Sequence, residues 1–411
     1  MRKSPPLIAA ISAAIIGCAP PAGISAAEAE MHHHGDAAPA CADPGLACAT
    51  VATPLFAQDG SLWLVWGAAG QVSVARSADL GRSFAAPIRI TPQPVRLDAG
   101  GDGRPMLAQG SNGRLVVAYA RFKDDLWNAE ALVSVSKDGG ASFSAPHPIT
   151  DDAAGQRFPV LASDGRGRIF AAWIDKRTTA AARAAGQPKP GAALAYAWSG
   201  DGGDHFDVSQ VFQDNSCECC RLGVAMDSRG LPAVLFRNLF DGGVRDHALI
   251  VFGNRSSPGP ASRVSEDNWV LNGCPHQGPS LAIGSGGTYH AAWFTLGPVR
   301  QGAFYARSTD GGRTFSPPLA LGSADRHPTR PYVLVADGIV WLAWKEFDGQ
   351  RTSVAVMRSH DDGNSWSMPR TIAKTDGDSD HPLLVSDGRH VFLSWLTHAE
   401  GYRLLPVDDD R

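Results

Sequence analysis

The sequence predicts an all-β protein built from seven repeated antiparallel sheets. Only 19% of its 411 residues are charged, and it contains 45 glycines and 29 prolines. This composition favours short strands joined by tight turns. Two patterns also recur along the chain, one typical of turns and one typical of strands, and such recurrence indicates a repeat architecture.

The turn pattern is Ser-x-Asp-x-Gly-x-Ser/Thr-Phe/Trp. In a tight hairpin the Ser and Asp side chains bond to backbone groups of the turn, glycine takes the position with positive φ, and the aromatic ring packs under the sheet. One variant has His205 at the position of the second hydroxyl. The copies begin at Ser77, Ser136, Ser199, Ser308 and Ser359.

The strand pattern is an apolar strand that often follows a proline, then a glycine turn, then a strand that ends near tryptophan. The segment from Pro159 to Trp173 is one example. A degenerate unit starts at Leu222, and its turn from Gly253 to Pro260 has lost the first motif. The predicted units start near Pro54, Pro105, Pro159, Leu222, Pro279, Pro331 and Pro382.

The turn motifs resemble the Asp boxes (BNR repeats) of sialidase-like β-propellers. The resemblance covers nearly all of the chain after its N-terminal tail, and it implies four-stranded antiparallel blades around a central channel. Seven unit starts predict seven blades, whereas known sialidases have six, which is the alternative if the first or last unit is not a blade. The last unit has three evident strands, and we expect the segment around Cys41 to Thr50 to complete it.

The N-terminal residues predict export from the cytoplasm. A positively charged start precedes an apolar run over residues 7–16, which is too short to span a bilayer as a stable helix. The run ends in Ile-Ile-Gly-Cys, which resembles a lipobox in which Cys18 becomes the lipidated first residue. We expect a signal peptide over 1–18, a flexible tether over 19–47 and one propeller domain over 48–411.

The expected location is therefore the bacterial cell envelope, with a secreted, soluble periplasmic protein as the alternative. The formal net charge is -4, which favours neither nucleic acid nor an anionic membrane surface as a partner. We expect contact with the membrane only through the lipid anchor.

The residues just before each unit start are expected to meet at one mouth of the channel, because the first strand of every blade lines it. Units four to seven bring cysteine and histidine to this mouth, and these donors suit Cu(I) or Zn. We predict a soft-metal site, for copper rather than zinc, and no organic cofactor. The predicted donors are Cys217, Cys219, Cys220, Cys274, His276, His327 and His381.

Disulfide bonds are the alternative for these cysteines. Six cysteines remain besides Cys18, and in an oxidising compartment an even number favours pairing. Cys41 would pair with Cys48, and two bridges would form among the other four. The protein would then be a disulfide-pinned scaffold for a protein partner.

The resemblance also raises sialidase activity as an alternative to metal binding. Sialidases bind the substrate carboxylate with three arginines, and use an Asp as acid/base and a Tyr, activated by a Glu, as nucleophile. The Arg-Ile-Pro motif that precedes their first box is absent here, so we expect metal binding without catalytic turnover. If the protein is instead a glycoside hydrolase for an anionic substrate, the candidates are Asp102 as acid, Tyr332 as nucleophile with Glu346, and Arg104, Arg157 and Arg330 as an anion cradle.

Overall fold

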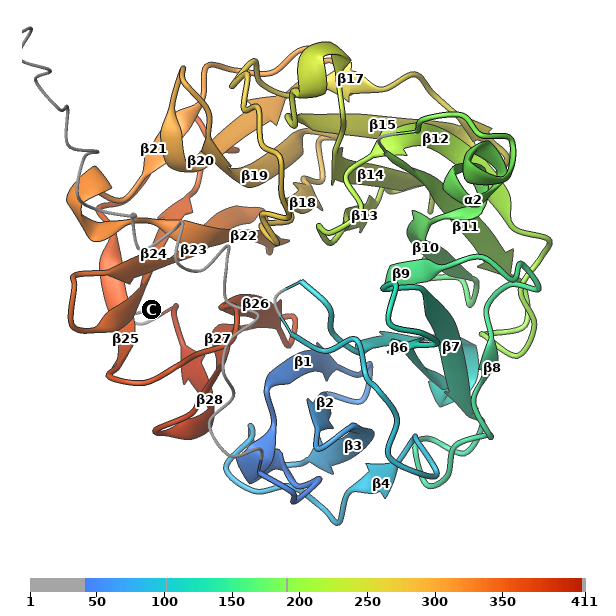
Figure 1. Cartoon of the computed structure of the whole chain (residues 1–411). Helices are drawn as coiled ribbons and strands as arrows, with labels where there is room; N and C mark the ends of the chain where they lie inside the picture. Colours follow the sequence, from blue (N-terminus) through green and yellow to red (C-terminus); the bar gives the residue numbers. More distant parts are fainter. Residues whose placement is uncertain (1–40, 101, 190, 409–411) are drawn as a thin grey trace, which may run out of the picture.

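The computed structural model describes residues 41–100, 102–189 and 191–408. These residues form seven antiparallel sheets that follow one another around a central channel (Figure 1), which confirms the predicted seven-bladed β-propeller. The predicted signal peptide, Cys18 and the tether up to residue 40 lie outside the described residues. In the part of the chain that the structure describes, none of the helices has the length and apolar character needed to span a bilayer.

The first three blades have four strands each. In all three, the strands follow one another from the channel outward in the order of the chain. Blade one contains β1 (Val51–Phe56), β2 (Leu62–Ala68), β3 (Gln71–Ser77) and β4 (Ile88–Arg89). Blade two contains β5 (Met106–Gln109), β6 (Leu115–Phe122), β7 (Ala129–Ser136) and β8 (His147–Pro148). Blade three contains β9 (Gln156–Ser163), β10 (Ile169–Asp175), β11 (Ala192–Ser199) and β12 (Gln210–Ser216).

The remaining blades vary more in their outer strands. Blade four contains β13 (Gly223–Met226), β14 (Pro232–Arg237), β15 (His247–Asn254), β16 (Ser257–Pro258) and β17 (Ser262–Arg263). Blade five contains β18 (Ser280–Ile283), β19 (Tyr289–Leu296), β20 (Gln301–Ser308) and β21 (Leu319–Leu321). Blade six contains β22 (Thr329–Ala336), β23 (Ile339–Phe347), β24 (Thr352–Ser359) and β25 (Arg370–Thr375), and blade seven β26 (Leu383–Ser386), β27 (Val391–Thr397) and β28 (Gly401–Pro406).

The helices of the described residues are short and lie before the first strand or in the connections between strands. The α-helix α2 (Arg177–Ala184) lies between β10 and β11. The 3-10 helices are η1 (Leu46–Cys48), η2 (Ser111–Gly113), η3 (Asp241–Gly243) and η4 (Ala324–Arg326). Every predicted unit start falls inside the first strand of its blade or directly before it.

Large apolar side chains of neighbouring blades pack against each other and form the core. Between blades three and four, for example, Phe170 contacts Phe252 with ring centroids 5.8 Å apart, and it contacts Trp198 of its own blade at 5.1 Å. Five tryptophans near the ends of second strands are buried, four of them predicted and the fifth Trp66, and each indole N–H donates a hydrogen bond. They are Trp66, Trp173, Trp293, Trp344 and Trp395, with acceptors on Pro44, Asp175, Asp267, Glu346 and Asp380.

The five copies of the Ser-x-Asp-x-Gly turn motif, called boxes from here on, join the third and fourth strands at the outer edge of the ring. In the box of blade two, Ser136 Oγ donates to Asp138 Oδ1 at 2.8 Å, and Gly140 N–H donates to Ser136 Oγ at 2.7 Å. Ser142 donates to Asp138 through its N–H at 2.9 Å and its hydroxyl at 2.6 Å. The side-chain bond from Ser142 is the largest cause that lowers the pKa of Asp138 to about 2. The other four boxes repeat this pattern, with His205 in place of the second hydroxyl in blade three.

The glycine at the fifth position of the box packs against the preceding blade. A Cβ at Gly140 would lie 2.0 Å from Trp63, and one at Gly363 would lie 2.1 Å from the Tyr305 hydroxyl. The boxes therefore set the close approach between neighbouring blades, in addition to closing their own turns.

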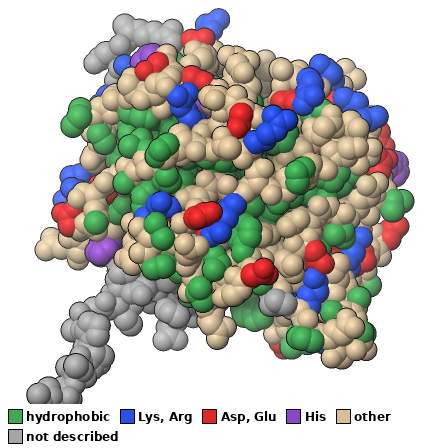
Figure 2. Space-filling model, turned by 90° about the horizontal axis from the view of Figure 1, so that it is seen from above, with side chains coloured by type: hydrophobic (Ala, Val, Ile, Leu, Met, Phe, Trp, Pro, Cys, Tyr) green, Lys and Arg blue, Asp and Glu red, His purple; other side chains and the backbone are tan. Residues whose placement is uncertain are grey.

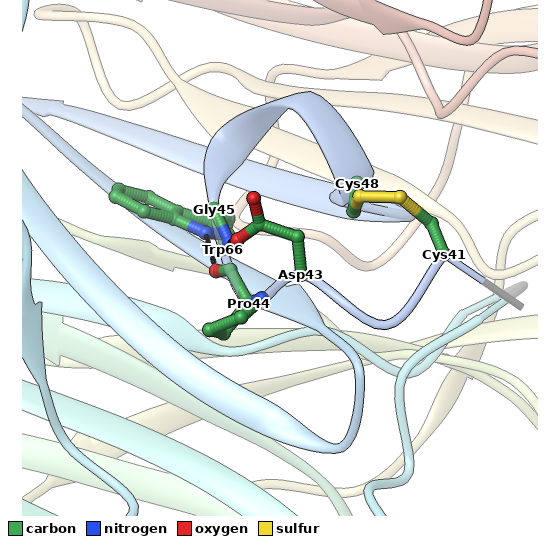
Figure 3. The surroundings of a disulfide bond; sticks show 6 residues. All are labelled: Cys41, Asp43, Pro44, Gly45, Cys48 and Trp66. Carbon is green, nitrogen blue, oxygen red and sulfur yellow. Dashed lines mark hydrogen bonds between the residues drawn. A yellow bond between two sulfur atoms is a disulfide. The ribbon is translucent and has the colours of Figure 1, made fainter.

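The prediction that the N-terminal segment adds a strand to the last blade is wrong for the described residues. Blade seven has three strands, and residues 46–48 form η1 beside β28 and β2. Trp66 Nε1–H donates to the carbonyl of Pro44 at 3.0 Å, and the predicted disulfide links Cys41 to Cys48 (Figure 3). These contacts fix the segment as a turn, so the ring closes instead through β1, which packs beside β26 and β27.

Candidate metal centre

Three cysteines lie in the turn that connects blade three to blade four. Cys217 follows β12 directly, and its N–H donates to the carbonyl of Arg237 at 2.9 Å. Its Sγ lies 3.6 Å from Sγ of Cys219 and 3.8 Å from Sγ of Cys220. All three side chains are buried and none of them is in a disulfide, so the turn concentrates three thiols in one small volume.

The loop that leads into blade five brings a fourth thiol and an imidazole to this turn. The donor atoms of Cys219, Cys274 and His276 lie within 4.8 Å of one another, as do those of Cys217, Cys219 and Cys220. Cys219 therefore belongs to both groups of donors. The two loops belong to neighbouring blades, as the sequence predicted.

Gly278 allows these two loops to touch. A Cβ at this position would lie 2.3 Å from Cγ of Arg221 and 2.6 Å from its carbonyl oxygen. Any side chain would push the Cys274–His276 loop away from the cysteine turn. The Gly278 N–H also donates to Asp102 Oδ2 at 2.6 Å, which fixes the loop on the wall of the channel.

The thiols differ in how readily they lose a proton. Hydrogen bonds from Cys219 and Cys220 hold the pKa of Cys217 well below its usual value, and the Arg245 guanidinium, 3.1 Å from Cys217 Sγ, contributes to the shift. Burial raises the pKa of Cys220. A hydrogen bond from Cys219 lowers the pKa of Cys274 to about 7. The lowered pKa values of Cys217 and Cys274 favour their thiolate forms, and thiolate is the form that binds metals.

The imidazole of the group is in the form needed for a metal ligand. Burial lowers the pKa of His276, so the ring is neutral at pH 7 and has a lone pair to donate. Its backbone is in the left-handed region, with φ of 48°, and its carbonyl accepts a hydrogen bond from Arg330.

Two arginines, the buried Arg237 and the half-buried Arg245, support the cysteine turn, and sequence reasoning did not identify them. Arg237, at the end of β14, donates to the carbonyls of Arg245, Gln277 and Phe294, each at 2.8 or 2.9 Å. Arg245 contacts Cys217 directly. Neither lies in a segment that starts a blade, and the only sequence signal is a charge at the end of the apolar run of residues 232–236.

Two of the predicted donors lie outside both groups. His381 Nδ1 lies 2.6 Å from Arg221 Nη1, in a cluster of ion pairs on the channel wall. His327 is half-buried at the end of η4, with φ of 46°. The structure therefore brings together five of the seven predicted donors.

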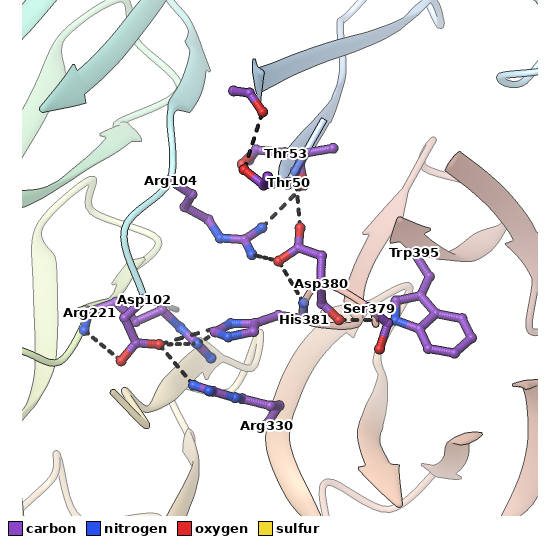
Figure 4. Close-up of polar contacts among 12 residues, drawn as sticks. Thr50, Thr53, Asp102, Arg104, Arg221, Arg330, Ser379, Asp380, His381 and Trp395 are labelled. Atoms are coloured by element: carbon purple, nitrogen blue, oxygen red, sulfur yellow. Dashed lines mark hydrogen bonds and ion pairs between the residues drawn. The ribbon is translucent and has the colours of Figure 1, made fainter. Parts of the chain in front are cut away.

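The ion-pair cluster joins the starts of several blades (Figure 4). The buried carboxylate of Asp102 accepts hydrogen bonds from the backbone and the guanidinium of Arg221, at 3.1 and 2.9 Å, and Arg330 Nη1 lies 3.5 Å away. Arg104 pairs with Asp380, whose other oxygen accepts the Ala52 N–H at 3.0 Å. These pairs tie the last blade to the first and second.

The candidate arginines for an anion cradle are each engaged with protein groups. Arg104 pairs with Asp380, Arg330 lies beside Asp102, and Arg157 forms two hydrogen bonds with Asp98, at 2.8 and 2.9 Å. A ligand carboxylate would have to displace or share these partners.

The structure does not bring the proposed nucleophile and its activator into contact. Tyr332 lines the channel cavity, and burial raises its pKa. Glu346 instead accepts the indole N–H of Trp344 at 2.8 Å and pairs with Arg326 Nε at 2.8 Å. A base that activates a tyrosine needs to lie within hydrogen-bonding reach of its hydroxyl.

The channel next to the ion-pair cluster holds a cavity of about 120 Å³. Apolar residues of the first strands line most of it, and Asp102, Arg104, Arg221 and Tyr332 contribute its polar wall. Pockets for small molecules usually enclose roughly 300 Å³ or more. On the outer surface, Figure 2 shows acidic and basic side chains interspersed on the face in view, without a large patch of one sign.

Comparisons with known proteins identify the fold. No family model matches the sequence, and no curated protein matches it. An ulvan lyase of polysaccharide lyase family PL25 is similar in structure, with a TM-score of 0.56, 12% identity, and coverage of 86% of this chain and 90% of the other. The Hadza microbial sialidase Hz136 gives a TM-score of 0.51, 14% identity, and coverage of 84% and 76%. A protein of unknown function from Dyadobacter fermentans gives a TM-score of 0.50, 18% identity, and coverage of 77% and 96%. At these identities, the likeness establishes a propeller fold shared with carbohydrate-active enzymes.

Proposed function

We propose that the protein binds a soft metal ion, copper in preference to zinc, through the cysteine turn and the Cys274–His276 loop. One observation carries this proposal: four thiols and an imidazole from two neighbouring blades converge, with donor atoms in two groups that are each within 4.8 Å. Sulfur atoms bound to one ion at about 2.3 Å lie about 3.8 Å apart in a tetrahedral arrangement and about 4.0 Å apart in a trigonal one. The 3.6 and 3.8 Å separations from Cys217 Sγ fit that spacing.

The bonding of the cysteines supports metal binding over a role of these cysteines as disulfide cross-links. Cys41 and Cys48 are bonded to each other, whereas the four cysteines at the channel mouth are free. Vicinal and nearly adjacent cysteines form strained bridges, and the neutral imidazole of His276 has no role in a disulfide staple. The role we propose is binding or handling of the metal, without catalytic turnover.

Elemental analysis of the protein purified from its native compartment, together with thiol counting, tests the proposal. We expect bound copper and, after its removal, four reactive thiols. The Cys217→Ser/Cys220→Ser double variant should bind less metal than the wild type, because it removes two of the five donors. Protein without metal, in which the same four cysteines are oxidised, would overturn the proposal.

The remaining two predicted donors need a separate measurement. His327→Ala and His381→Ala each remove one imidazole that lies outside both groups. We expect unchanged metal content in both variants, and loss of metal from either would extend the donor set to that residue.

We also propose that the protein is an Asp-box protein of the cell envelope. Five boxes with the same hydrogen-bond pattern support the first part, and the disulfide between Cys41 and Cys48 is typical of oxidising compartments. A Cys18→Ser variant tests the lipid anchor. We expect it to release the protein from the membrane fraction, and an unchanged distribution would contradict lipidation at this residue.

A glycoside hydrolase or related enzyme is the second candidate. The observation that favours it is the polar wall of the channel cavity, where Arg104 and Arg221 lie beside Tyr332. Fluorogenic sialosides and a panel of other anionic glycosides test it. Turnover that Arg330→Ala abolishes would establish the activity, and no turnover of any substrate by the wild-type protein would eliminate it for the classes tested.

A further inference from the structure

We propose that the Cys/His group at the channel mouth (Cys217, Cys219, Cys220, Cys274 and His276) holds two Cu(I) ions and that the Cys219 thiolate bridges them. This inference rests on the proposed metal-binding function and makes it more specific. One ion would be bound by Cys217, Cys219 and Cys220, and the other by Cys219, Cys274 and His276. Cys219 is the one residue that the two groups share.

The distances between the donor atoms indicate two bound ions, not one. Two ligands on opposite sides of an ion with bonds of about 2.3 Å lie at most about 4.6 Å apart. The described donors fall into two groups of three within 4.8 Å, and these groups do not merge into a larger one. A single ion therefore cannot be bound by all five donors, and two ions that share a thiolate use every one of them.

The number and type of donors favour Cu(I). Structural zinc sites almost always have four protein ligands, whereas each group here has three. Cu(I) is stable with three ligands, and soft thiolates select it. The one carboxylate inside the turn is not among the donors, because Glu218 pairs with Lys176 at 3.3 Å.

The charges around the turn fit a cluster with two monovalent ions. Four thiolates and two Cu(I) ions leave two negative charges. Among the described residues, neither Arg237 nor Arg245 has a carboxylate partner; Arg245 Nη1 lies 3.1 Å from Cys217 Sγ, and the carbonyl of Arg237 accepts the Cys217 N–H at 2.9 Å. Two otherwise uncompensated guanidinium charges thus lie next to a cluster that carries two negative charges, and such compensation is what buried charges require.

Stoichiometry tests the inference. The full mature protein, reduced and freed of metal, is titrated anaerobically with Cu(I) in competition with a chromophoric Cu(I) chelator. We expect two equivalents for the wild type. Cys274→Ser and Cys217→Ser should each retain one equivalent, because each removes a donor from one group only. Cys219→Ser should retain no tightly bound ion, since it leaves both groups with two donors.

Glu218→Gln is the matched control, because it lies within the turn but contributes no donor, and it should bind two equivalents. Cys274 is exposed, so its serine variant is the one expected to fold without change, as circular dichroism will verify. X-ray absorption should show Cu–Cu scattering in the wild type and none in Cys274→Ser.

The outcomes separate this inference from the proposed function. One equivalent in the wild type, retained in Cys274→Ser, would overturn the two-ion cluster and leave the soft-metal proposal standing. Two equivalents in Cys274→Ser would also overturn the bridging role. No bound copper in the wild type would overturn both proposals.

Discussion

The five boxes at the outer rim and the ion pairs around Asp102 at the channel mouth are built in opposite ways. In a box, each hydrogen bond joins residues two to four positions apart, as in Ser142 to Asp138 and Gly140 to Ser136. At the mouth, Arg221 and Gly278 bond to Asp102 across 119 and 176 positions, and Arg104 pairs with Asp380 across 276. The rim depends on local contacts that are copied five times, and the mouth depends on contacts made once.

This difference determines how each region tolerates change. A damaged box leaves four others intact, and its charged groups are exposed to water. A damaged mouth has no second copy, and its charges are buried, where an unpaired charge is costly. We therefore expect equivalent substitutions to destabilise the mouth more than the rim.

The largest expected effect is that of Asp102→Ala. The change leaves the buried Arg221 guanidinium and the Gly278 N–H without their acceptor. Removing one partner of a buried ion pair typically costs about 3–5 kcal/mol. Urea denaturation, followed by tryptophan fluorescence, measures the loss.

Asp138→Ala is the matched control for Asp102→Ala at the rim. It also removes an aspartate that accepts several hydrogen bonds, but this aspartate is exposed. We expect a smaller loss in the free energy of unfolding than for Asp102→Ala. Equal losses would show that the boxes are as critical as the mouth, and the contrast between the two regions would fail.

The rim and the mouth also differ in how much of them the sequence predicted. The boxes were predicted in full, because the residues that bond to each other are neighbours in the chain. Seven unit starts then predicted the blade number, since each lies inside an observed first strand or directly before it. At the mouth, the order of the blades predicted that Cys219, Cys274 and His276 would converge, and the structure confirms that they do.

The pairing within the mouth was beyond sequence reasoning. Nothing in the residue pattern distinguishes His276, which lies beside Cys219, from His381, which lies beside Arg221, because both precede the first strand of a blade. Their positions depend on loop conformation over a few ångströms, such as the close approach that Gly278 permits. Arg245 was missed for the same reason, since its contact with Cys217 arises from a loop between two strands.

A second prediction tests the claim that the boxes also set the spacing between blades. Gly140 has φ of +89°, and a Cβ there would lie 2.0 Å from Trp63. Gly140→Ala combines backbone strain of roughly 1–2 kcal/mol with overpacking of roughly 1–3 kcal/mol. Thermal unfolding should show a correspondingly lower midpoint.

The neighbouring glycine of the same box is the matched control. Gly139 has φ of +69°, but a Cβ there would have nothing within 4 Å. Gly139→Ala should therefore cost only the strain, roughly 1–2 kcal/mol. If the two variants unfold alike, the packing of the box on the preceding blade contributes little, and the boxes are purely local turns.

The smallest expected effect is the pH dependence of a single box. Hydrogen bonds from Ser142 lower the pKa of Asp138 from 3.8 to about 2. Because the folded pKa lies below the unfolded one, the ionised carboxylate stabilises the fold above about pH 4, and this stabilisation is lost as the pH falls toward 2. Asp138→Asn removes the titration, so the curves of unfolding free energy against pH for the wild type and the variant should lie apart at neutral pH and converge between pH 4 and 2.

Ser142→Ala removes the strongest hydrogen bond but keeps the carboxylate. It should reduce the separation that Asp138→Asn produces at neutral pH. Curves that stay parallel down to pH 2 would show that the box is held by its backbone turn, without a contribution from the charge of Asp138.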